Sequence, residues 1–551
     1  MVRRYRVGYM EQIKKVFLWL TILFVTTISP LLYSNNITLN NELTFCFTLI
    51  TTSLFFLSKS IEHNRHISLS IGDILCLFLV IYISSHNRTS WSILTNISIF
   101  TTYFLFRTEN RAKYILLKCL VFSGAIQIGI IIMQMLGHYS SEGSIIITGS
   151  FYNSAVLAMH ILICCTAGII LLIESNNIFY RIAFFIFISL ALIALFITKS
   201  RICIIATTII AIYYLTKYFH YNGKIFWSIT IFIALLITTI LYFIRPESAN
   251  GRLLIWRVSF DMFKNAFLFG YGENAYNCDY MLYQANFFSN HPHSTLAYLA
   301  DNVSYPFNEY IGIAVKYGLI GLTFSYAFIT QFVKIAIKQY NNLLVLIITY
   351  LIIAITSYPF EISHLYLVFF AILGSQHQNK LITFRIKKEC KIAITFCFLT
   401  ITTIGFYNLF DLYHANKNLC NLYKMQIEIS DKYYEKYKLN NHFNDYYFTW
   451  YMNNKQNCID KRILDAFPSS ESYCYMAQYL YQNNQIADAI HHLEISINMI
   501  PTRIKPRYEL WKIYKEIGDS IKAKKVATDV MQMPIKIEST TFLKLRKKMQ
   551  Q

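Results

Sequence analysis

The sequence predicts an all-α polytopic membrane protein with about 12–13 transmembrane helices, a long outer loop and a C-terminal helical-repeat domain. The chain is 55% hydrophobic and only 15% charged, whereas soluble domains carry roughly 25% charged residues. Long uncharged runs recur along it, and basic residues gather in the short loops between these runs. These observations exclude an ordinary soluble enzyme, a disordered chain and a coiled coil. The net charge of +20 is assigned to topology, and no nucleic-acid partner is expected.

The apolar runs define the expected helices in order. They occupy residues 16–33, 43–58, 67–84, 92–106, 115–136, 155–173, 178–197, 202–219, 225–244, 317–336 and 391–410. A further run, 343–374, is too long for one helix and is broken at Ser357-Tyr358-Pro359. We therefore expect a hairpin of two short spans there. The first run has no small-residue cleavage site, which predicts a retained helix rather than a removed signal peptide.

The positive-inside rule orients these spans. The N-terminus is basic, with Arg3, Arg4, Arg6, Lys14 and Lys15, so we expect it in the cytoplasm. Strict alternation then places the other basic loops on that same side. They contain Lys59/Arg65, Arg107/Arg111/Lys113, Arg181, Lys217/Lys224, Lys334/Lys338 and Lys380/Arg385/Lys387/Lys388. The long loop 245–310 and the tail from Asp411 fall on the outer side.

Two domains follow from this arrangement: a membrane domain, 1–410, which includes the loop 245–310, and an α-helical tail, 411–551. Within the tail, residues 480–489 match residues 514–523 at an offset of 34. That period, with small residues where two helices would cross, resembles tetratricopeptide repeats. The repeats could form a binding groove or a helical cap on the membrane domain. Cysteines outside the cytoplasm can form disulfides, but spacing does not select a pair among Cys420, Cys458 and Cys474.

Polar groups on the outer side are the candidates for chemistry. Thr198-Lys199-Ser200-Arg201 stands between two apolar runs, where it could act chemically or serve as a snorkelling anchor. The long loop adds Arg252, Arg257, His291, His293, Asp301 and Glu309. Arginine binds phosphate with two hydrogen bonds, and a histidine or buried carboxylate can accept a proton from a hydroxyl. His291 and His293 lack an obvious third ligand, so we expect no metal and no other cofactor.

The ordered set of motifs resembles the O-antigen ligase/O-antigen polymerase superfamily of bacterial membrane glycosyltransferases over about residues 145–375. The matching segments are Thr148-Gly149-Ser150-Phe151-Tyr152-Asn153, Lys199-Ser200-Arg201, Gly251-Arg252 with Trp256, Phe269-Gly270-Tyr271-Gly272, and Asn308-Glu309-Tyr310 followed by Lys316-Tyr317-Gly318-Leu319-Ile320-Gly321.

The resemblance implies transfer of a glycan from a polyprenyl-diphosphate carrier to an acceptor hydroxyl, without a metal or nucleotide sugar. It implies a multi-pass protein of the bacterial inner membrane, with the long loop and the C-terminal domain in the periplasm. Arg201 and Arg252 fall on the family's diphosphate-binding arginines, with Arg257 as a further candidate and Asn153 and Asn308 as supporting residues.

The family's histidine does not transfer, because Phe307 stands before Asn308. The candidate bases are therefore Glu309, His293 and His291, in that order. Glu309 comes first because it lies where the chain re-enters the membrane, and burial favours a carboxyl group that holds a proton more tightly. Arg257 follows Arg252 by five residues, about 140° around a helix, so the two arginines should not share a face.

Several functions remain open at this stage. The acceptor could be lipid A core, a growing glycan or a protein, which corresponds to a ligase, a polymerase or a protein O-oligosaccharyltransferase. A transporter or flippase for the same lipid-linked glycan is an alternative of another class, although the sequence shows no repeat of spans and its polar groups cluster outside the membrane. A non-catalytic anchor with a docking tail is a third.

Overall fold

The computed structural model describes most of the chain: residues 2–32, 39–60, 66–86, 90–140, 147–218, 246–339, 341–385, 387–423, 431–438, 461–533, 535–536 and 539–550, with a few isolated positions. The chain forms two compact units. The membrane unit comprises residues 1–243, 307–310 and 320–417, and the loop–tail unit comprises residues 244–306, 311–319 and 418–551.

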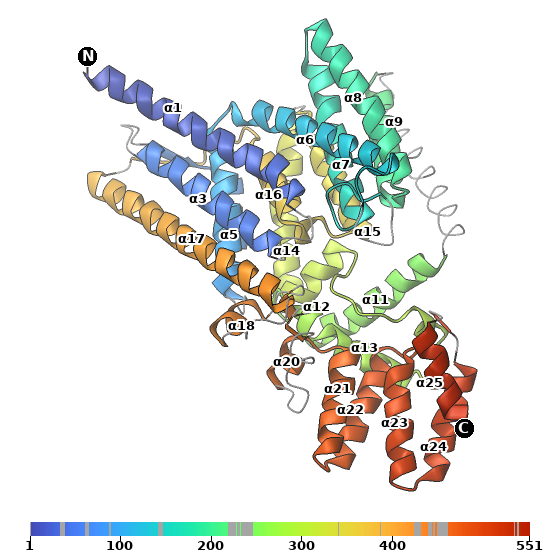
Figure 1. The fold of residues 1–551 in the computed structure, drawn as a ribbon. Coiled ribbons are helices and arrows are strands. Elements are labelled where there is room, and N and C mark those ends of the chain that lie inside the picture. The colour runs from blue at the N-terminus through green and yellow to red at the C-terminus, as the bar shows by residue number, and fades with distance from the viewer. Residues whose placement is uncertain are drawn as a thin grey trace. The chain divides into compact units, whose positions relative to one another are not determined.

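The membrane unit is built from helices that follow the apolar runs of the sequence (Figure 1). Its elements are α1 (Val2–Leu23), the π-helical η1 (Phe24–Ile28), α2 (Ser29–Leu31), α3 (Asn40–Ser60), β1 (His66–Leu69), α4 (Ile71–Ser85), α5 (Ser90–Thr108), α6 (Ala112–Met135), α7 (Ser154–Glu174), α8 (Ile178–Ile197), α9 (Arg201–Tyr218), α14 (Glu309–Lys338), α15 (Leu343–Thr356), η3 (Pro359–Glu361), α16 (Ser363–Gly374), β2 (Ile382–Arg385) and α17 (Lys388–Tyr423). Residues 311–319 of α14 and the end of α17 from 418 belong to the loop–tail unit.

The predicted fold class, an all-α polytopic membrane protein, is confirmed. Within the described residues, seven helices are long and apolar enough to cross a membrane, and four shorter apolar helices accompany them. The expected hairpin in 343–374 is α15 and α16, separated by η3 at Pro359. The expected span 225–244 lies outside the described residues, so the structure gives no complete count of spans.

Contacts between loops sort the helix ends of the membrane unit into two groups. At one end Lys59 pairs with Glu109 at 3.6 Å, and Lys113 pairs with Glu174 at 3.1 Å. At this end β1 also pairs with β2 in an antiparallel two-stranded sheet, with Ile67 opposite Phe384. All of these segments are loops or helix ends that the charge distribution assigns to the cytoplasm, so the contacts agree with the alternation.

The other group contains the helix ends assigned to the outer side. Asn41 at the start of α3 donates to the Glu361 carbonyl at 3.2 Å, in the break between α15 and α16. Ser150, just before α7, donates to the Pro30 carbonyl in α2 at 2.8 Å. The break in the hairpin therefore lies at the same end as the motif before α7.

The loop–tail unit contains the long loop and the C-terminal helices. Its elements are α11 (Pro246–Asn265), α12 (Ala275–Cys278), α13 (Tyr280–Asn290), η2 (Thr295–Leu299), α18 (Asp431–Tyr437), α20 (Lys461–Ala466), α21 (Ser470–Gln482), α22 (Ile486–Met499), α23 (Ile504–Glu516), α24 (Ser520–Gln532) and α25 (Thr540–Gln550).

Two helical hairpins of the tail, α21–α22 and α23–α24, repeat at 34 residues (Figure 1). The turns contain Asn484 and Gly518, 34 positions apart, and both have a positive φ, of 61° and 82°. Ala489 and Ala523 occupy equivalent positions and are both buried in one apolar core. Small side chains at these positions let neighbouring helices approach closely, which explains the spacing seen in the sequence.

The loop packs against the tail inside this unit. The α13 side chain of Gln284, fully buried, donates to the Met499 carbonyl at the end of α22 at 2.6 Å and to the Asp301 carbonyl at 3.1 Å. Lys536 donates to the Asp301 carboxylate at 3.1 Å. The described tail helices therefore form a support for the long loop.

The candidate disulfide cysteines fall in this unit or on its border. Cys474 is buried with its thiol free, and burial raises its pKa to about 12. The side chains of Cys420 and Cys458 lie outside the described residues.

Candidate functional site

Glu309 is the first residue of α14 and is only 5% exposed. Its Oε1 accepts a hydrogen bond from the Phe360 backbone N–H at 2.8 Å. Phe360 belongs to η3, the short turn that separates α15 from α16. The break in the apolar hairpin thus supplies an amide that holds the carboxylate of the first-ranked candidate base.

Tyr358 connects this carboxylate region to Asn153. The Tyr358 ring contacts the Phe307 ring edge to face, with centroids 5.4 Å apart, and its hydroxyl accepts from Asn153 Nδ2 at 3.2 Å. Asn153 also caps α7, because its Oδ1 accepts from the Ala155 N–H at 2.8 Å. Two segments that the sequence singled out, 148–153 and 307–310, therefore meet through Tyr358.

Phe307 itself adopts a positive φ of 52°. This conformation is unfavourable for a bulky side chain, and such strain is concentrated at functional sites. It occurs at the residue where the resembled family often carries histidine. The structure places an aromatic ring on Tyr358 at that position, so Phe307 offers no proton acceptor.

The Thr148-Gly149-Ser150 motif is held by two buried glutamines of α6. Gln134 Oε1 accepts from the Gly149 N–H at 2.9 Å, and Gln127 Oε1 accepts from the Ser150 N–H at 3.1 Å. Gly149 has a φ of +62°, and a Cβ there would come within 2.7 Å of Gln127 Oε1. The motif is therefore a backbone turn fitted to these amides. Sequence reasoning missed both glutamines, which were visible only as polar residues inside an apolar run.

Arg201 opens α9 directly after the turn that ends α8. Lys199 in that turn has a positive φ of 53°, and the chain reverses there between two apolar helices. Arg201 is half-buried. A guanidinium beside the N–H groups and positive dipole end of a helix is suited to bind a phosphate group.

The second pair of candidate arginines lies on α11 in the loop–tail unit. Arg252 is half-buried, and the Arg257 guanidinium lies 5.3 Å from the centroid of the Phe287 ring. The two share one helix at a separation of about 140°, so the expectation that they occupy different faces is consistent with α11. Trp256 between them donates from Nε1 to the Pro306 carbonyl at 3.0 Å, which fixes the end of the loop.

The two candidate histidines differ in their surroundings. His291 ends α13, its ring stacks on Phe287 with centroids 4.7 Å apart, and its Nδ1 lies 2.9 Å from the Phe287 carbonyl. A carbonyl can only accept, so Nδ1 carries the proton and Nε2 of the neutral ring is left as the proton acceptor. His293 is exposed two residues later in the turn. The contacts therefore prepare His291 better than His293 as a base.

The glycine motifs of the loop form one backbone junction. The N–H groups of Tyr271 and Gly272 donate to the carbonyls of Val315 and Lys316 at 3.0 and 2.8 Å. Gly318 breaks α14 with a φ of 64° and a ψ of −167°. A Cβ there would lie 2.2 Å from the Leu268 carbonyl oxygen. Two motifs whose bonded residues are 44 positions apart in the chain are glycine-rich because their backbones touch.

The candidate residues divide between the two units. Asn153, Arg201, Asn308 and Glu309 belong to the membrane unit, and Arg252, Arg257, His291 and His293 belong to the loop–tail unit. Within the described residues, no group of three or more His, Cys, Asp or Glu side chains is arranged to hold a metal ion, so no metal ligands are assigned.

One comparison with known proteins locates a family in this region. A family model described as O-antigen ligase matches residues 184–326. The match runs from α8 through α9 and the long loop to the first half of α14, and it contains every candidate site residue except Asn153. No curated protein matches the chain. The match covers 143 of the chain's 551 residues, and over this segment the multi-pass membrane protein is similar to the O-antigen ligase family.

Proposed function

We propose that this protein is a metal-independent glycosyltransferase of the bacterial inner membrane. It moves a glycan from a polyprenyl-diphosphate carrier to an acceptor hydroxyl on the periplasmic face. The observation that carries the proposal is the family match over residues 184–326, which contains both the helix start at Arg201 and the glycine junction of the loop. The start of α9 at Arg201 is consistent with phosphate binding at a helix N-terminus.

The chemistry follows from the donor. The acceptor oxygen attacks the anomeric carbon of the carried glycan while a base removes the hydroxyl proton. The bond between that carbon and the diphosphate oxygen breaks, and the diphosphate leaves with the bonding electrons. Arg201 and Arg252 stabilise the negative charge that accumulates there. A single direct displacement inverts the configuration at the anomeric carbon.

Glu309 is our first candidate for the base, and His291 is the second. Glu309 is supported by its burial and by its connection through the hairpin break to Asn153, where two family-like motifs meet. His291 is supported by the contact that leaves its Nε2 as the acceptor. We place His293 third because it is exposed. Asn308, beside Glu309, and Asn153 are assigned supporting roles.

A glycan transporter is the alternative of another class. A deletion strain separates the two, provided that donor lipid synthesis and flipping are measured as well. We expect undecorated acceptor, with lipid-linked glycan made and accumulated on the periplasmic side. Accumulation on the cytoplasmic side would instead identify a flippase. Within the transferases, loss of ligation, loss of chain length or loss of protein-bound glycan identifies a ligase, a polymerase or a protein O-oligosaccharyltransferase.

The tail repeats favour a large or proteinaceous acceptor. We propose that they form a tetratricopeptide-like domain in the periplasm that supports the loop. The hydrogen bonds of Gln284 to Met499 and Asp301 provide the physical link.

A further inference from the structure

A pocket of about 230 Å³, lined by both polar and apolar side chains, lies in the membrane unit at the end opposite the hairpin break. It is lined by the last turns of α14, the start of α4 and the segment before β2. The lining residues are Ser70, Ile71, Gln331, Lys334, Ile335, Lys338, Gln339, Gln378 and Asn379. Its helix ends belong to the group that the charge distribution assigns to the cytoplasm, so it is separate from the candidate transfer site.

The floor of the pocket is rigidly built. Gln378 is 2% exposed; its Oε1 accepts from the Ser70 hydroxyl and its Nε2 donates to the Tyr103 hydroxyl at 2.9 Å. Gly72 makes room for this side chain, because a Cβ there would lie 2.3 Å from Gln378 Oε1. Because the Gln378 side chain is held on both sides, it offers a ligand a polar surface in a fixed position.

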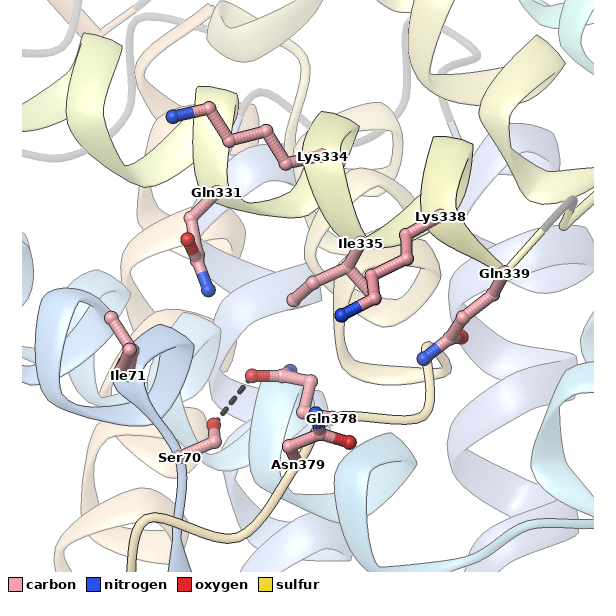
Figure 2. A pocket seen from close by; sticks show the side chains of 9 residues that line it. All are labelled: Ser70, Ile71, Gln331, Lys334, Ile335, Lys338, Gln339, Gln378 and Asn379. Carbon is pink, nitrogen blue, oxygen red and sulfur yellow. Dashed lines mark hydrogen bonds between the residues drawn. The ribbon is translucent and has the colours of Figure 1, made fainter.

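The pocket carries an excess of positive charge. Figure 2 shows Lys338 and Gln331 extending from α14 toward Gln378, while the Lys334 side chain, also part of the lining, runs along the helix with its nitrogen directed away from Gln378. Neither lysine forms an ion pair with a residue that the structure describes. The buried carboxylate behind the floor, Asp73, is already bound, since it lies 3.4 Å from Arg107 Nε and accepts from the Tyr103 hydroxyl at 2.7 Å.

Apolar side chains adjoin these cations. Ile71 and Ile335 line the pocket, and Ile71 is 49% exposed. Ile337, next to Lys338, is 57% exposed. α14 is one of the helices able to cross a membrane, and it ends at Lys338. A lipid with an anionic headgroup could contact all of these side chains: its headgroup the lysines and amides, and its acyl chains the exposed isoleucines. A free phosphate would contact only the lysines and amides.

We propose that this pocket binds the phosphodiester headgroup of an anionic phospholipid of the cytoplasmic leaflet. Lys338 and Lys334 neutralise the phosphate, the amides of Gln331 and Asn379 donate to its oxygens and to the polar headgroup, and the isoleucines contact the first acyl carbons. Basic pockets between membrane helices on this side are suited to such lipids.

The test is a native mass spectrometry titration of the purified full-length protein with dioleoylphosphatidylglycerol, and with dioleoylphosphatidylethanolamine as the zwitterionic comparison. We expect the wild type to prefer the anionic lipid. The double variant Lys334→Gln/Lys338→Gln should bind it roughly thirtyfold more weakly, because each lysine near an anionic lipid contributes about a fivefold gain. Asn379→Trp, which fills the pocket without changing the charge, should also lose this binding.

The matched control is Lys118→Gln/Lys387→Gln, which removes two exposed lysines that do not line the pocket. It should stay within threefold of the wild type, and all variants should elute as single species in size-exclusion chromatography. Equal binding by the wild type and both pocket variants would overturn the proposal. So would an equal loss in the control, or competition by soluble glycerol 3-phosphate at the lipid's own affinity, which would make a free phosphate ester the ligand.

Discussion

The Glu309 carboxylate and the Phe360 backbone N–H form a 2.8 Å hydrogen bond between the start of α14 and the break between α15 and α16. The bond joins a residue at the end of the long loop to a turn 51 positions later in the chain. Glu309 can therefore have two roles: its carboxylate accepts the hydrogen bond that holds η3, and it can take a proton from a hydroxyl. A substitution that keeps the hydrogen bond but cannot take a proton separates these roles.

Glu309→Gln should retain the bond to Phe360, because an amide oxygen accepts as a carboxylate does, but it cannot act as a base. We expect transfer to fall by 10²–10⁴-fold, the usual range for loss of a general base, with the protein still inserted and folded. Glu309→Ala should lose both activity and thermal stability. Near-wild-type transfer by Glu309→Gln would leave Glu309 a structural role and shift the base to His291, for which His291→Ala is the corresponding test.

Arg201→Ala and Arg252→Ala should each reduce transfer by about 10²–10³-fold, since each removes a donor that stabilises charge on the leaving diphosphate. Arg→Lys at either position should restore only part of the activity, because an ammonium lacks the paired donors of guanidinium. Arg181→Ala, an exposed arginine on α8, is the control and should be neutral. Full activity in either alanine variant would reduce that arginine to an interfacial anchor.

Gly318→Ala and Gly270→Ala should each disrupt the junction between the loop and α14. The added Cβ would meet backbone atoms, at 2.2 Å from the Leu268 carbonyl oxygen for Gly318 and 2.5 Å from the Lys316 carbonyl for Gly270. Both glycines also have a positive φ. Each substitution should therefore lower the free energy of unfolding by more than about 1–3 kcal/mol, the usual cost of one strained residue.

Gly251→Ala is the matched control, because nothing lies within 4 Å of a Cβ at this helical position. It should be neutral or slightly stabilising. Thermal unfolding and limited proteolysis of the long loop measure both effects. Equal stability of Gly318→Ala and Gly251→Ala would contradict the backbone contact.

Gln284→Leu should weaken the attachment of the loop to the tail, because it leaves the carbonyls of buried Met499 and of Asp301 without the amide that bonds both. Loss of such a partner costs about 1–3 kcal/mol. Gln482→Leu, at an exposed position of α21, makes the same chemical change without that cost. Hydrogen exchange of α13 and α22 should rise only in Gln284→Leu; unchanged exchange would mean that the tail does not support the loop.

The helices were largely predictable, because an apolar run of about 20 residues and a proline-containing break are local signals. The four-residue strands β1 and β2 were not expected, since they pair across more than 300 residues and such short segments carry little pattern. The 34-residue period of the tail equals the separation of the turns at Asn484 and Gly518.

The sequence predicted which residues belong to the candidate site, but only some of the contacts between them. Arg201 and Glu309 stood out because polar groups beside membrane spans are expensive, whereas Asn153 was named only through the family resemblance. Tyr358 was recognised as part of a helix break, but its role in joining Asn153 to the Phe307 ring depends on tertiary packing. Gln127 and Gln134 were hidden because a single polar residue inside an apolar run does not reveal its partner.

Whether this protein cleaves a lipid-linked donor and transfers its glycan can be measured with the purified protein. The protein is reconstituted in liposomes with a polyprenyl-diphosphate-linked glycan and a matching acceptor, in chelator and without nucleotide sugar. Product glycan and freed polyprenyl diphosphate are quantified together. We expect the wild type to form the two in equal amounts, with inverted anomeric configuration, and Arg201→Ala and Glu309→Gln to form neither. Intact donor in the wild-type reaction, or donor moved across the bilayer without cleavage, would contradict this expectation.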